Sequence, residues 1–127
     1  NPMPPRPESP RVRRVADRIV VELAEILSRE VEDPRLRALN VTAARVTRYL
    51  TAARVWVSGR LTPAEEAGVR AALEHSTPYF RTLLAPRLKL RVVPSLRFEF
   101  DHTLEAGARI EELLREIKNP PDEGKDD

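Results

Sequence analysis

Three pairs of a hydroxyl residue and a proline divide the chain, at Ser9-Pro10, Thr62-Pro63 and Thr77-Pro78. A serine or threonine hydroxyl can accept a hydrogen bond from the first turn of a helix. Proline suits the first helical position, because the amide hydrogen that it lacks would be unpaired there. Each pair therefore predicts the start of a helix. The third pair follows a helical pattern directly, so we expect two helices that meet at a sharp turn.

Apolar residues with helical spacing follow each predicted start. Residues 11–30, 62–75 and 78–86 each show this spacing, and residues 103–119 form a fourth helical segment whose leucines and isoleucines we expect to point inward. Pro34 is expected to end the first helix, because proline disfavours helical geometry in the residue before it. The chain is therefore predicted to contain four helices, of which the second and third are joined by the turn.

Three segments alternate between apolar and polar residues, as strands do. Residues 40–47 and 52–59 are separated by a short link, which favours an antiparallel hairpin. Residues 88–100 predict a third strand with a core face, a basic face and a bulge at Pro94. The order of segments indicates an α+β fold, with helices over one face of a three-stranded sheet. Trp56 falls on the polar side of its strand, where it could stack on a base or pack under a helix.

The composition of the chain indicates one folded domain between a proline-rich N-terminal end and an acidic C-terminal end. The 127 residues suit a single domain, which we assign to residues 11–118. Residues 1–10 are proline-rich and expected to be flexible, and residues 119–127 are expected to form an acidic, disordered tail. There is no cysteine, no run of 18 apolar residues and no signal-peptide pattern. We therefore expect a cytoplasmic protein, monomeric and not bound to membranes.

The charge of the predicted domain is more basic than that of the whole chain. The formal net charge is +2, from 22 basic and 20 acidic residues. The two ends carry two of the basic and five of the acidic residues, so the body has a net charge of +5. Most of its cations are arginines, whose planar forks match phosphate geometry. This balance is compatible with nucleic-acid binding and also with a solvated basic surface.

Residues that could perform catalysis or hold a metal do not form a recognisable arrangement. His75 and His102 lie far apart in the sequence, without a cysteine. Neither Ser58 nor Ser95 has the glycine context of a nucleophile elbow, and the four glycines form no phosphate-binding loop. We therefore expect no enzymatic activity, no catalytic residue, no metal site and no cofactor.

Four blocks in the chain carry a family resemblance: "RVRRVADRIVVELAEIL", "DPR" at 33–35, "VTAARVTRYLTAARVWVS" and "LRVVPSLRFEFDHTLEAGARIEELL". In this order and spacing, over residues 11 to about 114, the sequence resembles the bacterial ribosome-binding factor A family. The resemblance implies a type II KH-like fold, ordered helix, strand, strand, helix, kink, helix and strand, with a C-terminal helix. It also implies a non-catalytic factor that binds the small (30S) ribosomal subunit and assists late maturation of 16S rRNA near its 5′ end. Growth in the cold and an assembly GTPase partner belong to the same expectation.

Two positions depart from the family pattern. KH domains clamp the RNA backbone with a Gly-x-x-Gly turn between two helices. The resemblance implies that members of this family have an Ala-x-Gly kink in its place. The matching residues here are Ser76, Thr77 and Pro78, so neither the Gly-x-x-Gly nor the Ala-x-Gly signature is present. Because proline fixes φ, the bend is expected to be stiffer than a glycine bend. Tyr49 stands where the family tends to have aspartate.

The candidate RNA contacts combine a helix start with nearby cations. We expect phosphates to meet backbone N–H groups at the predicted turn and basic side chains around it. The predicted RNA-binding residues are Arg11, Arg14, Arg18, Ser76, Thr77, Arg81, Arg87, Lys89 and Arg91. Two alternatives remain open for the same basic face: a general KH-like RNA-binding module and an adaptor that meets an acidic protein partner.

Overall fold

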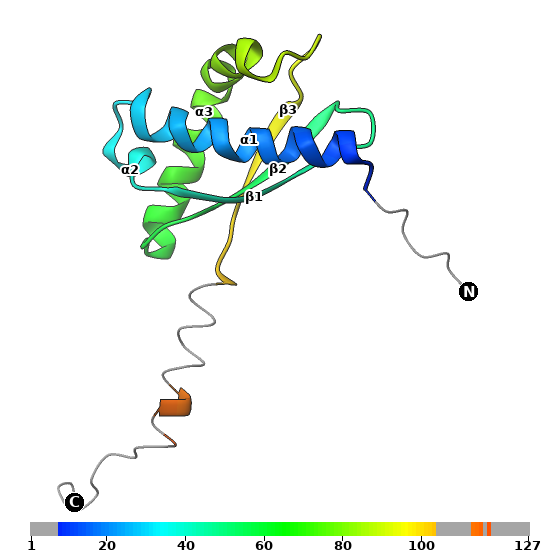
Figure 1. Cartoon of the computed structure of the whole chain (residues 1–127). Helices are drawn as coiled ribbons and strands as arrows, with labels where there is room; N and C mark the ends of the chain where they lie inside the picture. The colour runs from blue at the N-terminus through cyan, green and yellow to red at the C-terminus, as the bar shows by residue number, and fades with distance from the viewer. Residues whose placement is uncertain (1–7, 104–112, 116, 118–127) are drawn as a thin grey trace, which may run out of the picture.

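A computed structural model of the chain describes residues 8–103, 113–115 and 117. The elements follow one another as two helices, two strands, a helix and a strand, which agrees with the predicted α+β class (Figure 1). The elements with their bounds are α1 (Pro10–Arg29), α2 (Pro34–Arg37), β1 (Asn40–Val46), β2 (Ala52–Ser58), α3 (Pro63–Leu88) and β3 (Ser95–Phe100).

The three strands form one mixed sheet in the order β1-β2-β3. β1 and β2 are the predicted antiparallel hairpin, with a bulge between Val41 and Ala43, and β3 lies parallel to β2. α1 packs on β1, and α3 packs on β3 and on α1. The buried strand residues all belong to the face that meets these helices, and they are Val46, Ala53, Val55, Val57 and Phe98.

α1 follows the predicted local chemistry. The Ser9 hydroxyl accepts a hydrogen bond from the Val12 amide at 3.1 Å, and Pro10 takes the first turn. One face of the helix is buried from Val12 to Leu27, while Arg11 and Arg14 are exposed. The first helix therefore presents its basic residues to solvent, as predicted.

α3 begins as predicted and then continues where a turn was expected. Thr62 and Glu65 form the reciprocal capping box. Thr77 does not cap a new helix, because its hydroxyl donates to the Leu73 carbonyl at 2.8 Å inside a helix that runs on to Leu88. Pro78 has no amide hydrogen for the preceding turn, and proline inside a helix produces a bend. Figure 1 shows the yellow-green end of α3 running in a different direction from its green start.

The third strand is shorter than predicted. α3 passes through Pro86 to Leu88 and ends at Lys89, whose φ of 54° is left-handed, and β3 begins only at Ser95. The predicted strand over 88–94 is therefore wrong. Residues after Lys89 form a loop that ends at the buried Pro94.

Two further differences concern short helical segments. α1 ends at Arg29, and Asp33 caps the separate helix α2, which the sequence pattern did not indicate. In the predicted last helix, Leu113, Leu114 and Ile117 are helical but exposed, so their predicted burial is wrong. The other apolar positions of that segment lie outside the described residues, as do most residues of both predicted ends. None of the described helices is long and apolar enough to cross a membrane.

Candidate nucleic-acid interface

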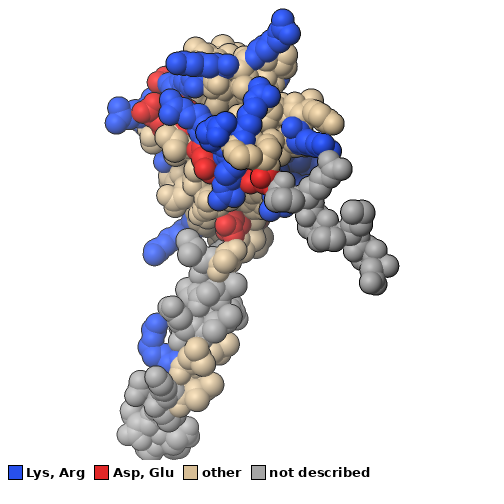
Figure 2. Space-filling model, turned by 45° about the vertical axis from the view of Figure 1, so that its right-hand side comes forward, with Lys and Arg blue, Asp and Glu red and all other residues tan. Residues whose placement is uncertain are grey.

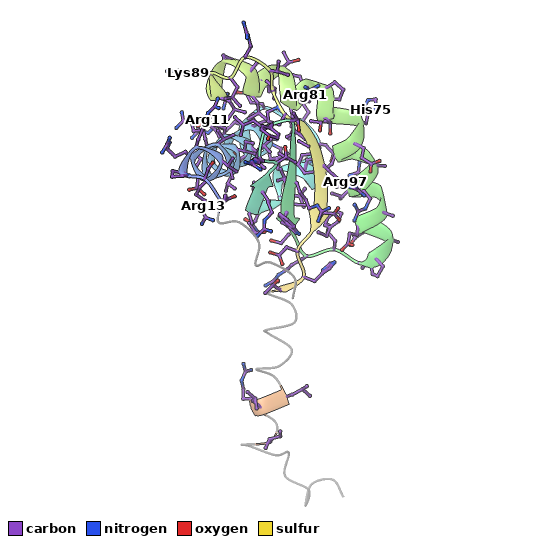
Figure 3. All side chains as sticks on the ribbon, turned by 90° about the vertical axis from the view of Figure 1, so that its right-hand side faces the viewer. Arg11, Arg13, His75, Arg81, Lys89 and Arg97 are labelled. Carbon is purple, nitrogen blue, oxygen red and sulfur yellow. The ribbon has the colours of Figure 1, made fainter. Side chains whose placement is uncertain are left out.

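The start of α1 and the end of α3 surround one basic hollow. Its volume is about 720 Å³, and both helices contribute to its wall. Figure 3 shows Arg11 and Lys89 on the same side of the molecule. Five of the nine predicted RNA-binding residues line this hollow: Arg11, Arg14, Arg18, Arg87 and Lys89.

A second hollow of about 450 Å³ adjoins the first through Arg11, which lines both. Arg81 and Arg91 lie in its wall together with residues of the hairpin turn. Figure 2 shows many lysine and arginine side chains over the upper part of the molecule, with fewer acidic side chains scattered among them. We call the seven predicted cations around the two hollows the helical basic surface: Arg11, Arg14, Arg18, Arg81, Arg87, Lys89 and Arg91.

Arg87 is an internal cation of this surface. Its guanidinium lies 3.2 Å from the Glu22 carboxylate and 2.8 Å from that of Glu25, and a third carboxylate, Glu30, lies at 3.8 Å. Glu22 is itself buried and also pairs with Arg18 at 2.9 Å. The carboxylates balance these two cations, so Arg87 ties the end of α3 to α1 more than it offers charge to a ligand.

Arg81 is also engaged inside the protein. Its Nε donates to the Pro94 carbonyl at 3.1 Å and its Nη2 to the Val93 carbonyl at 2.7 Å. These two bonds hold the loop before β3 against α3. The Arg81 side chain is half-buried, and its fork is directed at the protein backbone.

Four cations of the surface are open to a ligand. Arg11, Arg14, Lys89 and Arg91 are exposed, and within the described part of the chain none forms an ion pair or a side-chain hydrogen bond. We call these four residues the open cations. Anions can reach them from solvent without first breaking an internal contact.

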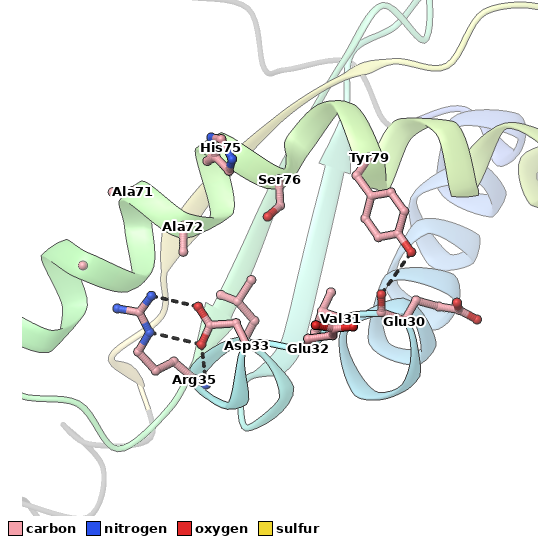
Figure 4. A pocket seen from close by; sticks show the side chains of 12 residues that line it. Glu30, Val31, Glu32, Asp33, Arg35, Ala71, Ala72, His75, Ser76 and Tyr79 are labelled. Carbon is pink, nitrogen blue, oxygen red and sulfur yellow. Dashed lines mark hydrogen bonds and ion pairs between the residues drawn. The ribbon is translucent and has the colours of Figure 1, made fainter.

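Ser76 and Thr77 do not join the helical basic surface. Ser76 lines a separate groove of about 660 Å³ beside the connection from α1 to α2 (Figure 4). Thr77 is half-buried within α3, so the free amides expected at a helix start are absent at this position. Figure 3 places the neighbouring His75 away from Arg11 and Lys89. The predicted helix start at Thr77 is therefore wrong, while RNA contact by Ser76 and Thr77 stays a prediction.

The groove beside Ser76 has an acidic rim. Glu30, Glu32 and Asp33 line it, and the Tyr79 hydroxyl donates to the Glu30 carbonyl at 3.1 Å. Hydrogen bonds from Arg35 lower the pKa of Asp33 below its ordinary value, and the same pair raises the pKa of Arg35. Arg35 balances the charge of Asp33, and the further carboxylates of Glu30 and Glu32 give the groove a negative rim that does not favour phosphate.

Sequence reasoning missed a row of three arginines on the outer face of the sheet. Arg45 lies opposite Arg54, and Arg54 lies opposite Arg97. The polar alternation was a signal for each residue, but only the register of the strands places them in one row. Trp56 is half-buried on this same face, opposite the one on which α1 and α3 pack, and lies 5.9 Å from the Arg54 guanidinium. Most of the predicted last helix lies outside the described residues, so the choice between stacking and packing under that helix stays open.

The described residues supply no metal-binding cluster, since no three or more of their His, Cys, Asp and Glu side chains group together. The described surface offers guanidinium and ammonium groups that can bind anions, and the rings of Tyr49, Tyr79 and, in part, Trp56 are exposed beside them.

Known proteins similar to this chain share one description. The sequence model of the family described as ribosome-binding factor A matches residues 11–114. A protein of that name from Thiobacillus denitrificans is 37% identical over 119 residues, which cover 90% of this chain and 96% of the relative. A second, from Halothermothrix orenii, is 35% identical over 117 residues, which cover 92% of this chain and 96% of the relative.

Solved structures with the same description have the same fold. The crystal structure of ribosome-binding factor A from Thermus thermophilus superposes with a TM-score of 0.62 at 28% identity, and it covers 69% of this chain and 93% of that one. A Thermus thermophilus homology model, fitted into a cryo-electron-microscopy map of a complex with the 30S subunit, has a TM-score of 0.58 at 29% identity. It covers 68% of this chain and 90% of that one.

Proposed function

Because this chain belongs to the ribosome-binding factor A family, we propose that it associates with the small (30S) ribosomal subunit and assists late maturation of 16S rRNA near its 5′ end. The observation that carries the proposal is the group of open cations where α1 and the end of α3 meet. The Thermus thermophilus relative fitted into a map of its 30S complex supports the choice of partner.

In this proposal the open cations bind phosphates of folded ribosomal RNA. Arg11 and Arg14 lie on α1, whereas Lys89 and Arg91 follow the end of α3, so the charges come from two segments that pack together. Phosphate contacts position a protein on RNA without reading bases. Specificity then comes from the shape of the rRNA, and the protein acts by holding a conformation, without catalysis.

Arg81 and Arg87 keep a role in the proposal as positioning residues. Arg87 fixes the last turn of α3 to α1, which places Lys89 beside the α1 arginines. Arg81 fixes the loop carbonyls at Val93 and Pro94, and thereby the neighbourhood of Arg91. An arrangement held before binding loses less conformational entropy when the RNA arrives.

The experiment that tests the function is sedimentation of the full chain with purified small subunits. We expect the protein to sediment with both precursor and mature 30S particles, and to bind the precursor more tightly. Sedimentation with neither particle would contradict the proposal. Binding naked single-stranded RNA as tightly as assembled subunits would indicate a general RNA-binding module. A large native complex that survives nuclease treatment would indicate an adaptor for a protein partner.

The finer circumstances of action are part of the same proposal. The family resemblance supports a monomer that works in the cytoplasm, together with an assembly GTPase, and that matters most for growth in the cold. Size-exclusion chromatography of the free chain tests the monomer directly, and sedimentation with and without the GTPase tests the second partner.

A further inference from the structure

The outer face of the sheet carries three cations at one level. Arg45, Arg54 and Arg97 occupy neighbouring strands as direct register partners. Adjacent strands are about 4.8 Å apart, so the three side chains leave the sheet close together and on the same side. All three are exposed, and no described helix covers this face.

Such a row is costly in the free protein. Like charges directly opposite one another on neighbouring strands destabilise a sheet. Arg97 has one carboxylate nearby, that of Glu99 at 3.4 Å, and the exposed fraction of the Arg97 side chain is 77%. Neither Arg45 nor Arg54 forms an ion pair within the described residues. A bound polyanion would remove the repulsion that the row creates.

The next row of the same face contains an aromatic ring. Trp56 on β2 has Ala43 as its register partner on β1 and Glu99 as its partner on β3. Because the Ala43 side chain is small, it covers little of the ring on the β1 side. A hollow of about 840 Å³ borders the ring, with Ala43 and Val21 among its apolar walls. The ring is half-buried, and the Arg54 guanidinium lies over it at 5.9 Å. An aromatic ring beside cations is the combination that binds single-stranded nucleic acid, because bases stack on the ring while phosphates meet the charges.

Acidic groups in the wall of this hollow restrict the path of an RNA strand. Asp17 pairs with Arg13, and Asp101 accepts hydrogen bonds from Thr42 and Thr103. These carboxylates would repel phosphates. A polyanion on this face is therefore expected to follow the arginine row across the three strands, with only the base side reaching toward Trp56.

We propose that the outer face of the sheet binds single-stranded RNA, with phosphates on Arg45, Arg54 and Arg97 and one base stacked on Trp56. The cations of this surface lie on the sheet and are different residues from those of the helical basic surface, although the hollow beside Trp56 and the larger hollow of the helical basic surface share Asp17 and Val21 in their walls. The inference therefore goes beyond the proposed function. The protein would contact two RNA segments at once. An acidic protein segment could use the arginines but has no comparable use for the ring.

The experiment uses Trp56 as its own probe, because it is the only tryptophan in the chain. The full chain is titrated at low salt with an eight-nucleotide oligouridylate while tryptophan emission is recorded. We expect saturable quenching. Inorganic polyphosphate, which has charge without bases, and polyglutamate should change the emission much less. Equal quenching by polyglutamate, or no quenching by the oligonucleotide, would overturn the proposal.

Matched variants locate the signal. Replacing Arg45, Arg54 and Arg97 together by glutamine should weaken oligouridylate binding at least tenfold and reduce the log–log salt slope by about 2. Trp56→Ala should weaken binding at least about fivefold when anisotropy of a labelled oligonucleotide is the readout. Unchanged affinity in both variants would reject the surface.

Two controls separate this inference from the proposed function and from misfolding. The triple glutamine variant should unfold at the same or a higher urea concentration than the parent, because like-charge repulsion is removed. Arg11→Gln with Arg14→Gln and Lys89→Gln should weaken binding to small subunits while quenching of Trp56 by oligouridylate persists. Loss of quenching in this second variant would show that the sheet face is not a separate site.

Discussion

Arg81 donates from both sides of its fork to backbone carbonyls, of Pro94 at 3.1 Å and Val93 at 2.7 Å. Arg81→Ala is therefore expected to lower the free energy of unfolding by about 1–3 kcal/mol, as measured by urea denaturation, because two charged hydrogen bonds are lost. The exposed Arg91 is the matched control, and Arg91→Ala should change stability by less than about 0.5 kcal/mol. Equal effects of the two substitutions would refute a structural role for Arg81.

Arg87 is the shared partner of three carboxylates that come from α1 and the residue after it. Arg87→Ala should cost about 1–3 kcal/mol of stability, less than breaking a fully buried pair, because Glu22 keeps its contact with Arg18. Thermal unfolding at low and high salt measures this cost, with the unpaired Arg14→Ala as control. A variant as stable as the parent would show that the network contributes nothing.

The pKa of the Asp101 carboxyl should depend on the hydrogen bonds that this carboxylate accepts. Bonds from Thr103 and then Thr42 lower the pKa of Asp101 from its model-compound value of 3.8. The stability that these hydrogen bonds contribute is fully present above pH 3.8. It is lost as the pH falls through the lower pKa that Asp101 has in the folded protein. Carboxyl-carbon NMR titration should find the pKa below 3.8 in the parent and closer to it in Thr42→Val. An identical pKa in both would remove Thr42 from the explanation.

At the scale of residues, the sequence indicated the cations of the helical basic surface, but it indicated neither what each one contacts nor the arginine row on the sheet. The apolar face of α1 already placed Arg11, Arg14 and Arg18 together. The partners of Arg87 were hidden because Glu22 lies 65 positions away along the chain. Likewise, the carbonyls that hold Arg81 belong to a loop that the alternation pattern had placed in a strand.

Among the elements, α3 shows why identical local chemistry has two outcomes. Thr62-Pro63 follows a loop, so its cap begins a helix, whereas Thr77-Pro78 follows residues that are already helical. There the Thr77 hydroxyl bonds back to Leu73 instead. Burial of Leu73 before Pro78 and of Phe80 after it holds both halves on one core. Tertiary packing therefore keeps Pro78 inside one helix, although the local sequence around it predicts the start of a new helix.

Pro78→Ala tests this explanation of α3. The new amide at position 78 should exchange with solvent faster than the amides of the turns on either side, because core packing of both halves maintains the bend. The stability change should stay within about 1 kcal/mol, since greater freedom of the unfolded chain offsets any bond gained. Hydrogen exchange followed by NMR measures both quantities. An amide at 78 as protected as its neighbours would mean that the proline alone creates the bend.

β3 and the residues before it show that a local pattern is also insufficient to place the start of a strand. The alternation from Leu88 to Phe100 was correct only from Ser95, where pairing with β2 begins. Before that point Leu88 completes α3, and Lys89 adopts a left-handed conformation that ends the helix. A pattern with period two alone therefore cannot distinguish a strand from a helix end followed by a loop, and in this loop Val92 is exposed although the alternation had placed it on the core face.

For the whole molecule, the position of the open cations matters more than the net charge. The formal charge of the chain is only +2, yet two groups of its cations occupy defined areas, one beside α1 and α3 and one on the sheet. The acidic groove beside Ser76 lies elsewhere. This separation of charge predicts that RNA approaches the molecule from particular sides, with phosphate kept away from the bend of α3.

The most direct test of the central claim is the salt dependence of binding to purified small subunits. The parent chain should lose affinity steeply as salt rises. Arg11→Gln with Arg14→Gln and Lys89→Gln should bind more weakly at low salt and show a log–log slope smaller by about 2–3, since three phosphate contacts are lost. A triple variant with the affinity and slope of the parent would contradict the assignment of the open cations as the ribosomal RNA contact.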